Sequence, residues 1–181
     1  MNAPKPYDLT THGGKRVDWL TKAALLKAER MLGYELTIVQ GSYNSGKVSA
    51  SAGSHDGGGV VDLAPWDWER KVRALRLCGF RAWYRKELWK NGKRVWGDHI
   101  HAVQQGNDKL SPGAVQQVLQ AIRGRDGLAA SGPDPHPHLK FKKFSWPYGG
   151  VVGLARWRRD QLTGLAREKY LKRLRKVVRG N

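Results

Sequence analysis

Two histidines and an aspartate stand close together in the stretch GDHIH, residues 97–101. The surrounding sequence, RVWGDHIHAV, alternates in the manner of a strand. On a strand, His99 and His101 point to one face and Asp98 to the other, because successive side chains alternate. Two imidazoles that share a face can bind a metal ion, which is one reason for a strand to carry them.

A second set of metal-ligand side chains lies upstream, next to a Gly/Ser-rich segment. His55 and Asp62 are separated by six residues, and Asp62 stands inside the apolar run VVDL. An ionised carboxylate in a buried strand needs a compensating charge, which a metal ion provides. Two histidines and one aspartate, with a fourth position open to water, form the ligand set with which catalytic zinc brings the pKa of bound water to about 7.

The segments SAGSHDGGGVVDL and GDHIH together resemble the motifs of a family of zinc peptidases. This is the family of D-alanyl-D-alanine carboxypeptidases and L-alanyl-D-glutamate endopeptidases, which is related to the vancomycin-resistance dipeptidases and includes phage endolysins. The resemblance implies that His55, Asp62 and His101 bind Zn²⁺. It also implies that Asp98 is the general base that acts on the attacking water, and that His99 lines the site.

The resemblance extends over about residues 40–103, with one departure before the first histidine. Members of the family usually carry an arginine there that grips the substrate carboxylate, whereas this chain reads QGSYNSG. We therefore predict that Gln40, Ser42, Tyr43 and Asn44 bind the peptide through neutral hydrogen bonds. A neutral anchor favours an internal amide, so an endopeptidase is expected in preference to a carboxypeptidase.

The elements around these motifs predict an α+β fold with a small antiparallel sheet and flanking helices. The resemblance implies the fold of hedgehog and D-Ala-D-Ala metallopeptidase domains. Helices are expected over about 18–32, 66–78 and 111–122, from apolar spacing and cap residues. Strands are expected over 35–43, 60–65, 80–89 and 94–103, the last two joined as a hairpin by KNGK. A regular strand would turn Asp98 away from His101, so a bend or strand end is expected near Asp98.

The net charge of +18 is unevenly distributed, because residues 139–181 hold 13 Lys/Arg against 2 Asp/Glu. We divide the chain into a catalytic domain over 1–130, a Pro/Gly-rich wrapping segment or linker over 131–150, and a basic amphipathic helix over 151–181. The helix carries an apolar stripe of Leu162, Ala166, Tyr170, Leu174 and Val177. The basic residues predicted to bind an anionic surface are Arg167, Lys169, Lys172, Arg173, Arg175 and Lys176. An anionic wall polymer or lipid is the expected target, with nucleic acid less favoured.

Two other functions fit parts of the sequence. DHIH also resembles the start of the His-Asn-His endonuclease motif, and the high charge suits DNA. The following segment SPGAVQQVLQAIRG, however, offers no second histidine or asparagine, and a nuclease leaves His55 with Asp62 unexplained. The third possibility is a binding or structural module of a virion that keeps the peptidase fold without its activity.

The remaining sequence features bear on location. No signal-peptide pattern and no run of eighteen apolar residues is present, and the sole cysteine, Cys78, excludes an internal disulfide. We expect a protein made in the cytoplasm that reaches bacterial peptidoglycan after phage-type lysis or as part of a virion.

Overall fold

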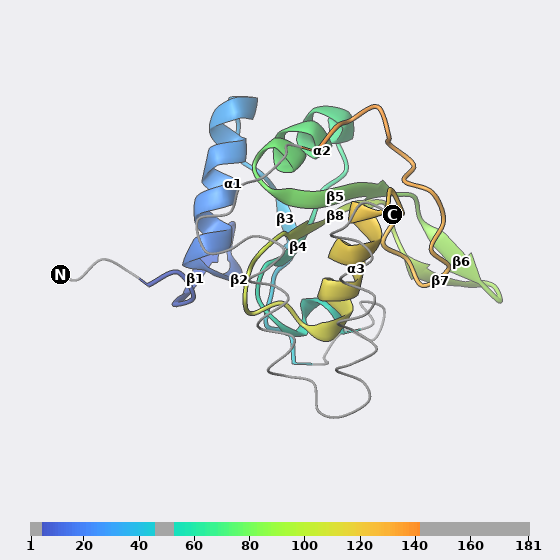
Figure 1. Ribbon diagram of the computed structural model, residues 1–181, viewed down its shortest axis with the longest axis horizontal. Coiled ribbons are helices and arrows are strands. Elements are labelled where there is room, and N and C mark those ends of the chain that lie inside the picture. Colours follow the sequence, from blue (N-terminus) through green and yellow to red (C-terminus); the bar gives the residue numbers. More distant parts are fainter. Residues whose placement is uncertain (1–4, 46–52, 142–181) are drawn as a thin grey trace. The chain divides into compact units, whose positions relative to one another are not determined.

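The computed structural model describes residues 5–45 and 53–141 and has an α+β fold, as the sequence predicts. The predicted basic helix and its six anion-binding residues lie outside these ranges. The elements follow in the order β1 (Leu9–His12), β2 (Lys15–Asp18), α1 (Trp19–Leu32), β3 (Ile38–Gln40), the 3-10 helix η2 (Ser54–Asp56), β4 (Val60–Leu63), α2 (Trp68–Leu77), β5 (Phe80–Arg85), β6 (Leu88–Lys90), β7 (Lys93–Trp96), β8 (His99–Gln104) and α3 (Pro112–Ile122) (Figure 1). In the described part, no helix is both long and apolar enough to cross a bilayer.

Cap residues place α1 and α3 where the sequence predicts them. The Asp18 carboxylate accepts a hydrogen bond from the Thr21 amide at 2.7 Å, and Ser111 does the same for the Ala114 amide. Such side chains satisfy amides that the first turn of a helix leaves unpaired. Gly33 ends α1 in the left-handed conformation, with φ 80°, which a residue without a Cβ adopts at little cost.

The central sheet has the strand order β3-β4-β8-β5, and all its neighbouring strands are antiparallel. Asp62 of β4 lies opposite His101 of β8, which in turn lies opposite Trp83 of β5. Cα partners in an antiparallel pair point to the same face. The register therefore gathers these three side chains on one face, although 39 positions separate the aspartate from the histidine.

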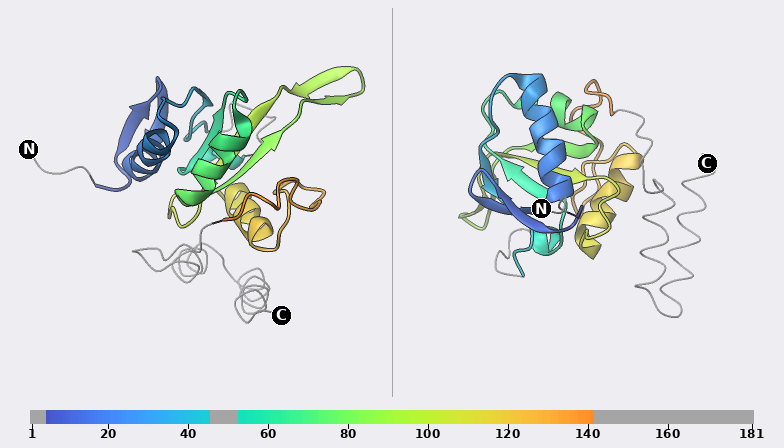
Figure 2. Two further views of the ribbon diagram at one scale, coloured as in Figure 1. Left: turned by 90° about the horizontal axis from the view of Figure 1, so that it is seen from above. Right: turned by 90° about the vertical axis from the view of Figure 1, so that its left-hand side faces the viewer.

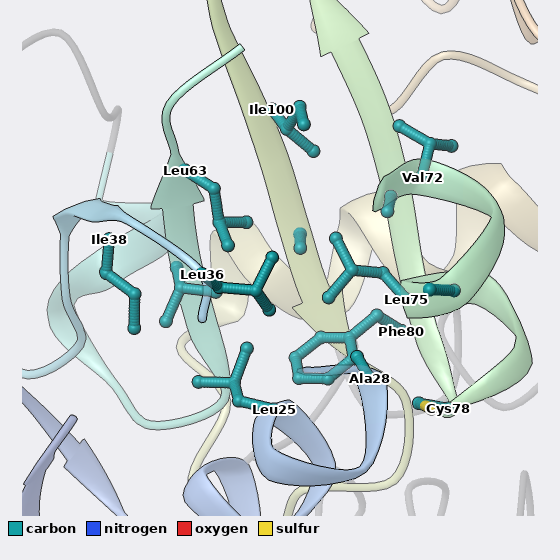
Figure 3. Packing of buried hydrophobic residues seen from close by; sticks show 14 of the residues in the cluster. Leu25, Ala28, Leu36, Ile38, Leu63, Val72, Leu75, Cys78, Phe80 and Ile100 are labelled. Atoms are coloured by element: carbon teal, nitrogen blue, oxygen red, sulfur yellow. The ribbon is translucent and has the colours of Figure 1, made fainter. Parts of the chain in front are cut away.

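The opposite face of the sheet carries the hydrophobic core. Figure 3 shows Leu25 of α1 and Leu75 of α2 packed beside Phe80 and Ile100 of the sheet. Val61 and Leu63, which flank Asp62, are fully buried in this cluster. Strand alternation thus separates an apolar face under α1 and α2 from a polar face on the side of α3.

The predicted hairpin is confirmed in its pairing, but the structure divides each of its strands into two. β5 pairs with β8 in the sheet, whereas β6 and β7 form a separate ribbon that projects beyond the sheet (Figure 2). Where β5 and β8 give way to β6 and β7, side chains take part in the hydrogen bonds between the two segments. The Glu87 amide donates to the Asp98 carboxylate, and the Trp96 indole donates to the Lys86 carbonyl. The expected strand end near Asp98 is therefore present.

Arg76 of α2 ties the residues after α3 to the domain. Its buried guanidinium donates to the carbonyls of Ala82, His136 and Leu139 and to the Asp134 carboxylate. Leu139 is 1% exposed and belongs to the core cluster. The described part of the Pro-rich segment is thus packed on the domain.

Arg76→Met is expected to lower the free energy of unfolding by about 3–5 kcal/mol, because it leaves the buried Asp134 carboxylate without its cation. Urea denaturation followed by circular dichroism measures this change. Arg73→Met is the matched control on the same helix, since the Arg73 side chain is 60% exposed and lies 3.9 Å from Glu69. This control should change the free energy by less than about 1 kcal/mol; equal losses in both variants would contradict the role assigned to Arg76.

Candidate metal centre

Three buried side chains from separate elements meet on the polar face of the sheet. His55 comes from η2, Asp62 from β4 and His101 from β8, and one ligand atom from each lies within 4.8 Å of the others. These are the three residues that the sequence predicts as metal ligands. The structure brings them together, and this group could hold a metal ion.

The Gly-rich loop positions His55 by close backbone contacts. The Asn44 amide donates to the His55 carbonyl, and the Gly58 amide donates to the Lys109 carbonyl. A Cβ added to Gly57 would lie 2.1 Å from the Lys109 carbonyl oxygen. Any larger residue would push the loop away from Lys109, so this glycine is needed for the fit of the loop.

The His55 ring presents a lone pair to the Asp62 carboxylate. Its Nδ1 lies 2.8 Å from the Gly41 carbonyl oxygen, which can only accept, so Nδ1 carries the proton. Nε2 is buried without a hydrogen-bond partner and lies 3.3 Å from Asp62 Oδ2. An imidazole lone pair beside a carboxylate oxygen is uncompensated unless a proton or a metal ion stands between them.

His101 lies between Asp62 and the side-chain amide of Gln117. Its Nδ1 lies 2.7 Å from Asp62 Oδ1, and its Nε2 lies 2.8 Å from Gln117 Oε1 of α3. A neutral ring carries one proton, which it donates either to Asp62 or to the Gln117 amide. Burial, together with the charge of Arg85, lowers the pKa of His101 to about 4, so the ring is neutral at pH 7.

Asp62 supplies the negative charge of the centre. Burial alone would raise the pKa of its carboxyl group, but the adjacent imidazoles, His101 above all, lower it far below the ordinary value. The carboxylate is therefore ionised. With two imidazole nitrogens it forms an N₂O donor set, which suits zinc and related transition-metal ions.

Trp83 covers the His101 side of the centre. The two rings stack with centroids 6.3 Å apart and an interplanar angle of 17°. Gly127 lies against the indole, because a Cβ there would be 2.9 Å from the ring. The stacked indole and Gln117 together fix the orientation of the His101 ring, as outer partners of metal ligands commonly do.

The predicted general base lies outside this group. The exposed Asp98 carboxylate accepts from the Tyr84 hydroxyl and from the Glu87 amide, each at 2.7 Å. These hydrogen bonds, that from Tyr84 first, lower the pKa of Asp98. Because Tyr84 packs against the core, the hydroxyl holds Asp98 at the rim of the sheet rather than beside the three ligands. The role of Asp98 in catalysis stays a prediction.

His99 shares the face of His101, as the alternation predicts. It lies two positions before His101 on β8 and opposite Arg85 of β5. Its Nδ1 is 2.7 Å from the Gly97 carbonyl oxygen and therefore carries a proton.

Of the four residues predicted to bind substrate, Gln40 is the strand partner of the ligand Asp62. An irregularity in the register between Ile38 and Gln40 places Ile38 opposite Leu63 and Gln40 opposite Asp62. Gln40 therefore shares the polar face with Asp62, and its Nε2 is buried without a hydrogen-bond partner.

The other three line a separate cavity of about 270 Å³ together with Arg16. The Ser42 hydroxyl bonds to the backbone of Val60, and the Tyr43 hydroxyl donates to Asp18 at 3.0 Å. Burial, with the Asp18 carboxylate, raises the pKa of Tyr43. Ser42 and Tyr43 thus have structural partners.

Trp83, Arg85 and Gln117 are site residues that the sequence does not mark as functional. The alternation of FRAWYR would have placed Trp83 and Arg85 on one face, but nothing in the sequence assigns that face to the ligands. Nothing in the sequence around Gln117 predicts its contact with His101.

A scan against protein-family models and comparisons with curated proteins and solved structures give no match.

Proposed function

We propose that this chain is a zinc-dependent peptidase that hydrolyses an amide bond in the stem peptides of bacterial peptidoglycan, as an endopeptidase. One observation carries the proposal: two imidazoles from separate elements converge on one buried, ionised carboxylate with ligand atoms within 4.8 Å of one another, and His55 Nε2 is buried there without a hydrogen-bond partner. The resemblance of the two motifs to zinc D-alanyl-D-alanine carboxypeptidases and L-alanyl-D-glutamate endopeptidases supports the choice of substrate.

The residues of the site would divide metal binding, proton transfer and oxyanion stabilisation among them. His55 Nε2, the Asp62 carboxylate and His101 Nδ1 would hold the zinc ion. Zinc in such a site supplies a Lewis acid that makes water a nucleophile at neutral pH and polarises the scissile carbonyl. Asp98 would take the proton from the attacking water, for which its carboxylate must exchange the Tyr84 hydroxyl for water. His99 would stabilise the developing oxyanion by a hydrogen bond when its ring is protonated.

The two alternatives make different predictions about the site. A His-Asn-His nuclease needs a further metal-ligating side chain on the helix after the strand, where α3 presents Gln117 to His101. A peptidase-fold binding module needs no base and no turnover. The nuclease motif leaves the convergence of His55 with Asp62 unexplained, and a binding module does not require it.

Digestion of purified peptidoglycan tests the proposal. The protein is incubated with peptidoglycan with and without chelator, and new amino and carboxyl termini are identified by mass spectrometry. Chelator-sensitive release of stem-peptide termini is expected. Intact stem peptides would overturn the proposal, and metal-dependent nicking of plasmid DNA would favour the nuclease.

Deletion of residues 151–181 is expected to weaken binding to whole cell walls while cleavage of a small soluble stem peptide stays near the wild-type rate. The segment carries most of the positive charge of residues 139–181, which favours attachment to anionic wall polymers after lysis or from a virion. Binding is measured by co-sedimentation at several salt concentrations, and the loss should be largest at low ionic strength. Loss of soluble-substrate activity in the truncated protein would contradict a docking role.

A further inference from the structure

Arg85 is a cation on the same face of the sheet as the three ligands. It is the last residue of β5, two positions after Trp83, whose partner on β8 is His101. Two positions along a strand span about 7 Å. The central carbon of the Arg85 guanidinium lies 5.7 Å from the centroid of the Trp83 ring, which stacks on His101, and its charge contributes to the low pKa of His101.

The Arg85 guanidinium lacks the partners that a buried cation needs. Its Nε and Nη2 are buried without a hydrogen-bond partner, and across residues 5–45 and 53–141 it makes no ion pair. Arg76 differs, because it has four oxygen acceptors. Arg81 differs in part, since its Nε is also buried without a partner but its Nη2 donates to Gln105. A buried charge without a partner is costly and is usually completed by an anion.

The acids whose charge acts on Arg85 are Asp62 and Asp126. Asp62 lies against the two imidazoles, and Asp126 accepts a hydrogen bond from the Leu128 amide. Burial lowers the pKa of Arg85 to about 10, which leaves the guanidinium charged at neutral pH. The cation is thus present and open to an added anion.

Arg85 also lines a cavity of about 370 Å³ between β5, the β6–β7 ribbon and the residues after α3. Most of the wall is apolar, with Trp83, Trp96, Leu88, Leu128 and Pro133 among the lining residues. Lys86, Glu87 and Asp126 are the other charged residues that line the cavity. Such a wall accepts a small aliphatic group, and the single guanidinium accepts a negative one. Nε and Nη2 form the edge of a guanidinium that binds a carboxylate side-on through two hydrogen bonds. Binding requires this edge to turn toward the cavity.

We propose that Arg85 binds a carboxylate of the substrate and so supplies, from β5, the cationic anchor that the segment before His55 lacks. This inference rests on the proposed peptidase function. The carboxylate has two possible sources in a stem peptide: the C-terminal carboxylate, or the carboxylate of a D-glutamyl residue inside the chain. Both would place an aliphatic alanyl group beside the apolar wall.

Three peptides separate the sources. They are a stem peptide with both carboxylates, its C-terminal amide, and its isoglutamine form, and kcat/KM is measured for each with the zinc-loaded full chain. The peptide whose amidation lowers kcat/KM about 10- to 100-fold identifies the bound carboxylate, in keeping with the strength of a charge-assisted hydrogen bond. Arg85→Gln should lower kcat/KM for the acid by the same factor and abolish the preference for the acid over its amide. Arg85→Lys should keep part of this preference.

Arg81→Gln is the matched control, because Arg81 points to the same face two positions before Trp83 and has Gln105 as partner. It should keep the wild-type preference. If wild type cleaves all three peptides equally, or if Arg85→Gln keeps the preference, the inference is wrong while the peptidase function stands.

A binding measurement keeps the inference testable if the protein cleaves no peptide or if the variants do not fold. ¹⁵N-labelled wild type without metal is titrated with N-acetyl-D-alanine, N-acetyl-D-isoglutamate and their amides, and the arginine Nε–H resonances are followed. A saturable shift of one arginine resonance with an acid but not with its amide supports the anchor. Absence of any such shift overturns it.

Discussion

His101→Ala is expected to abolish stoichiometric zinc binding. Wild type purified without chelator should hold one zinc ion per chain, because His55, Asp62 and His101 supply three buried donors within 4.8 Å of one another. Removing one imidazole leaves one nitrogen and one carboxylate. A catalytic zinc site needs three protein ligands, so two are too few. Elemental analysis after gel filtration measures the ratio of zinc to protein.

A thermal measurement adds a second readout for the same variant. An ion that binds the folded state raises the unfolding temperature. Chelator should therefore lower the unfolding temperature of wild type and leave the unfolding temperature of His101→Ala unchanged. His138→Ala is the control, since His138 has a 58% exposed side chain and contacts Glu69 at 3.9 Å instead. Stoichiometric zinc in His101→Ala, or its absence from wild type, would show that the ligand assignment is wrong.

Asp98→Asn is expected to keep zinc and to lose activity by about 10² to 10⁴-fold, the usual contribution of general acid–base catalysis. The asparagine oxygen can still accept from the Glu87 amide, so the local backbone should be kept, whereas the amide cannot take a proton from water. Zinc content and kcat/KM on a soluble stem peptide are measured on the same preparation. Loss of zinc would make Asp98 structural, and unchanged turnover would exclude it as the base.

Tyr84→Phe is the companion variant, because it removes the hydroxyl that holds Asp98 and leaves the carboxylate in place. The hydrogen bond from Tyr84 lowers the pKa of Asp98, so its removal should raise that pKa toward the ordinary value. A base must be deprotonated, and activity falls as the pH drops through its pKa. The acid limb of the kcat/KM profile should therefore move to higher pH in Tyr84→Phe if Asp98 is the base.

The sequence by itself determined the local features of this protein. Apolar spacing and Gly33 predicted α1, and Ser111 predicted the start of α3, because a side-chain oxygen beside a helical run caps free amides. The turn residues Asn91 and Gly92 predicted the hairpin, since both adopt positive φ. The residue types of His55, Asp62 and His101 predicted a metal centre, because that chemistry depends on the donors alone.

The tertiary structure decided which distant side chains meet. The register of β4 on β8 sets Asp62 against His101, and the irregularity in β3 turns Gln40 to the same face. Tyr84, fourteen positions away along the chain, holds the Asp98 carboxylate at the rim. Arg85 became a candidate anchor only when the pairing of β5 with β8 placed it on the ligand face. Local sequence fixes the face and conformation of each residue relative to its neighbours, but contacts between strands depend on register and packing summed over the whole domain.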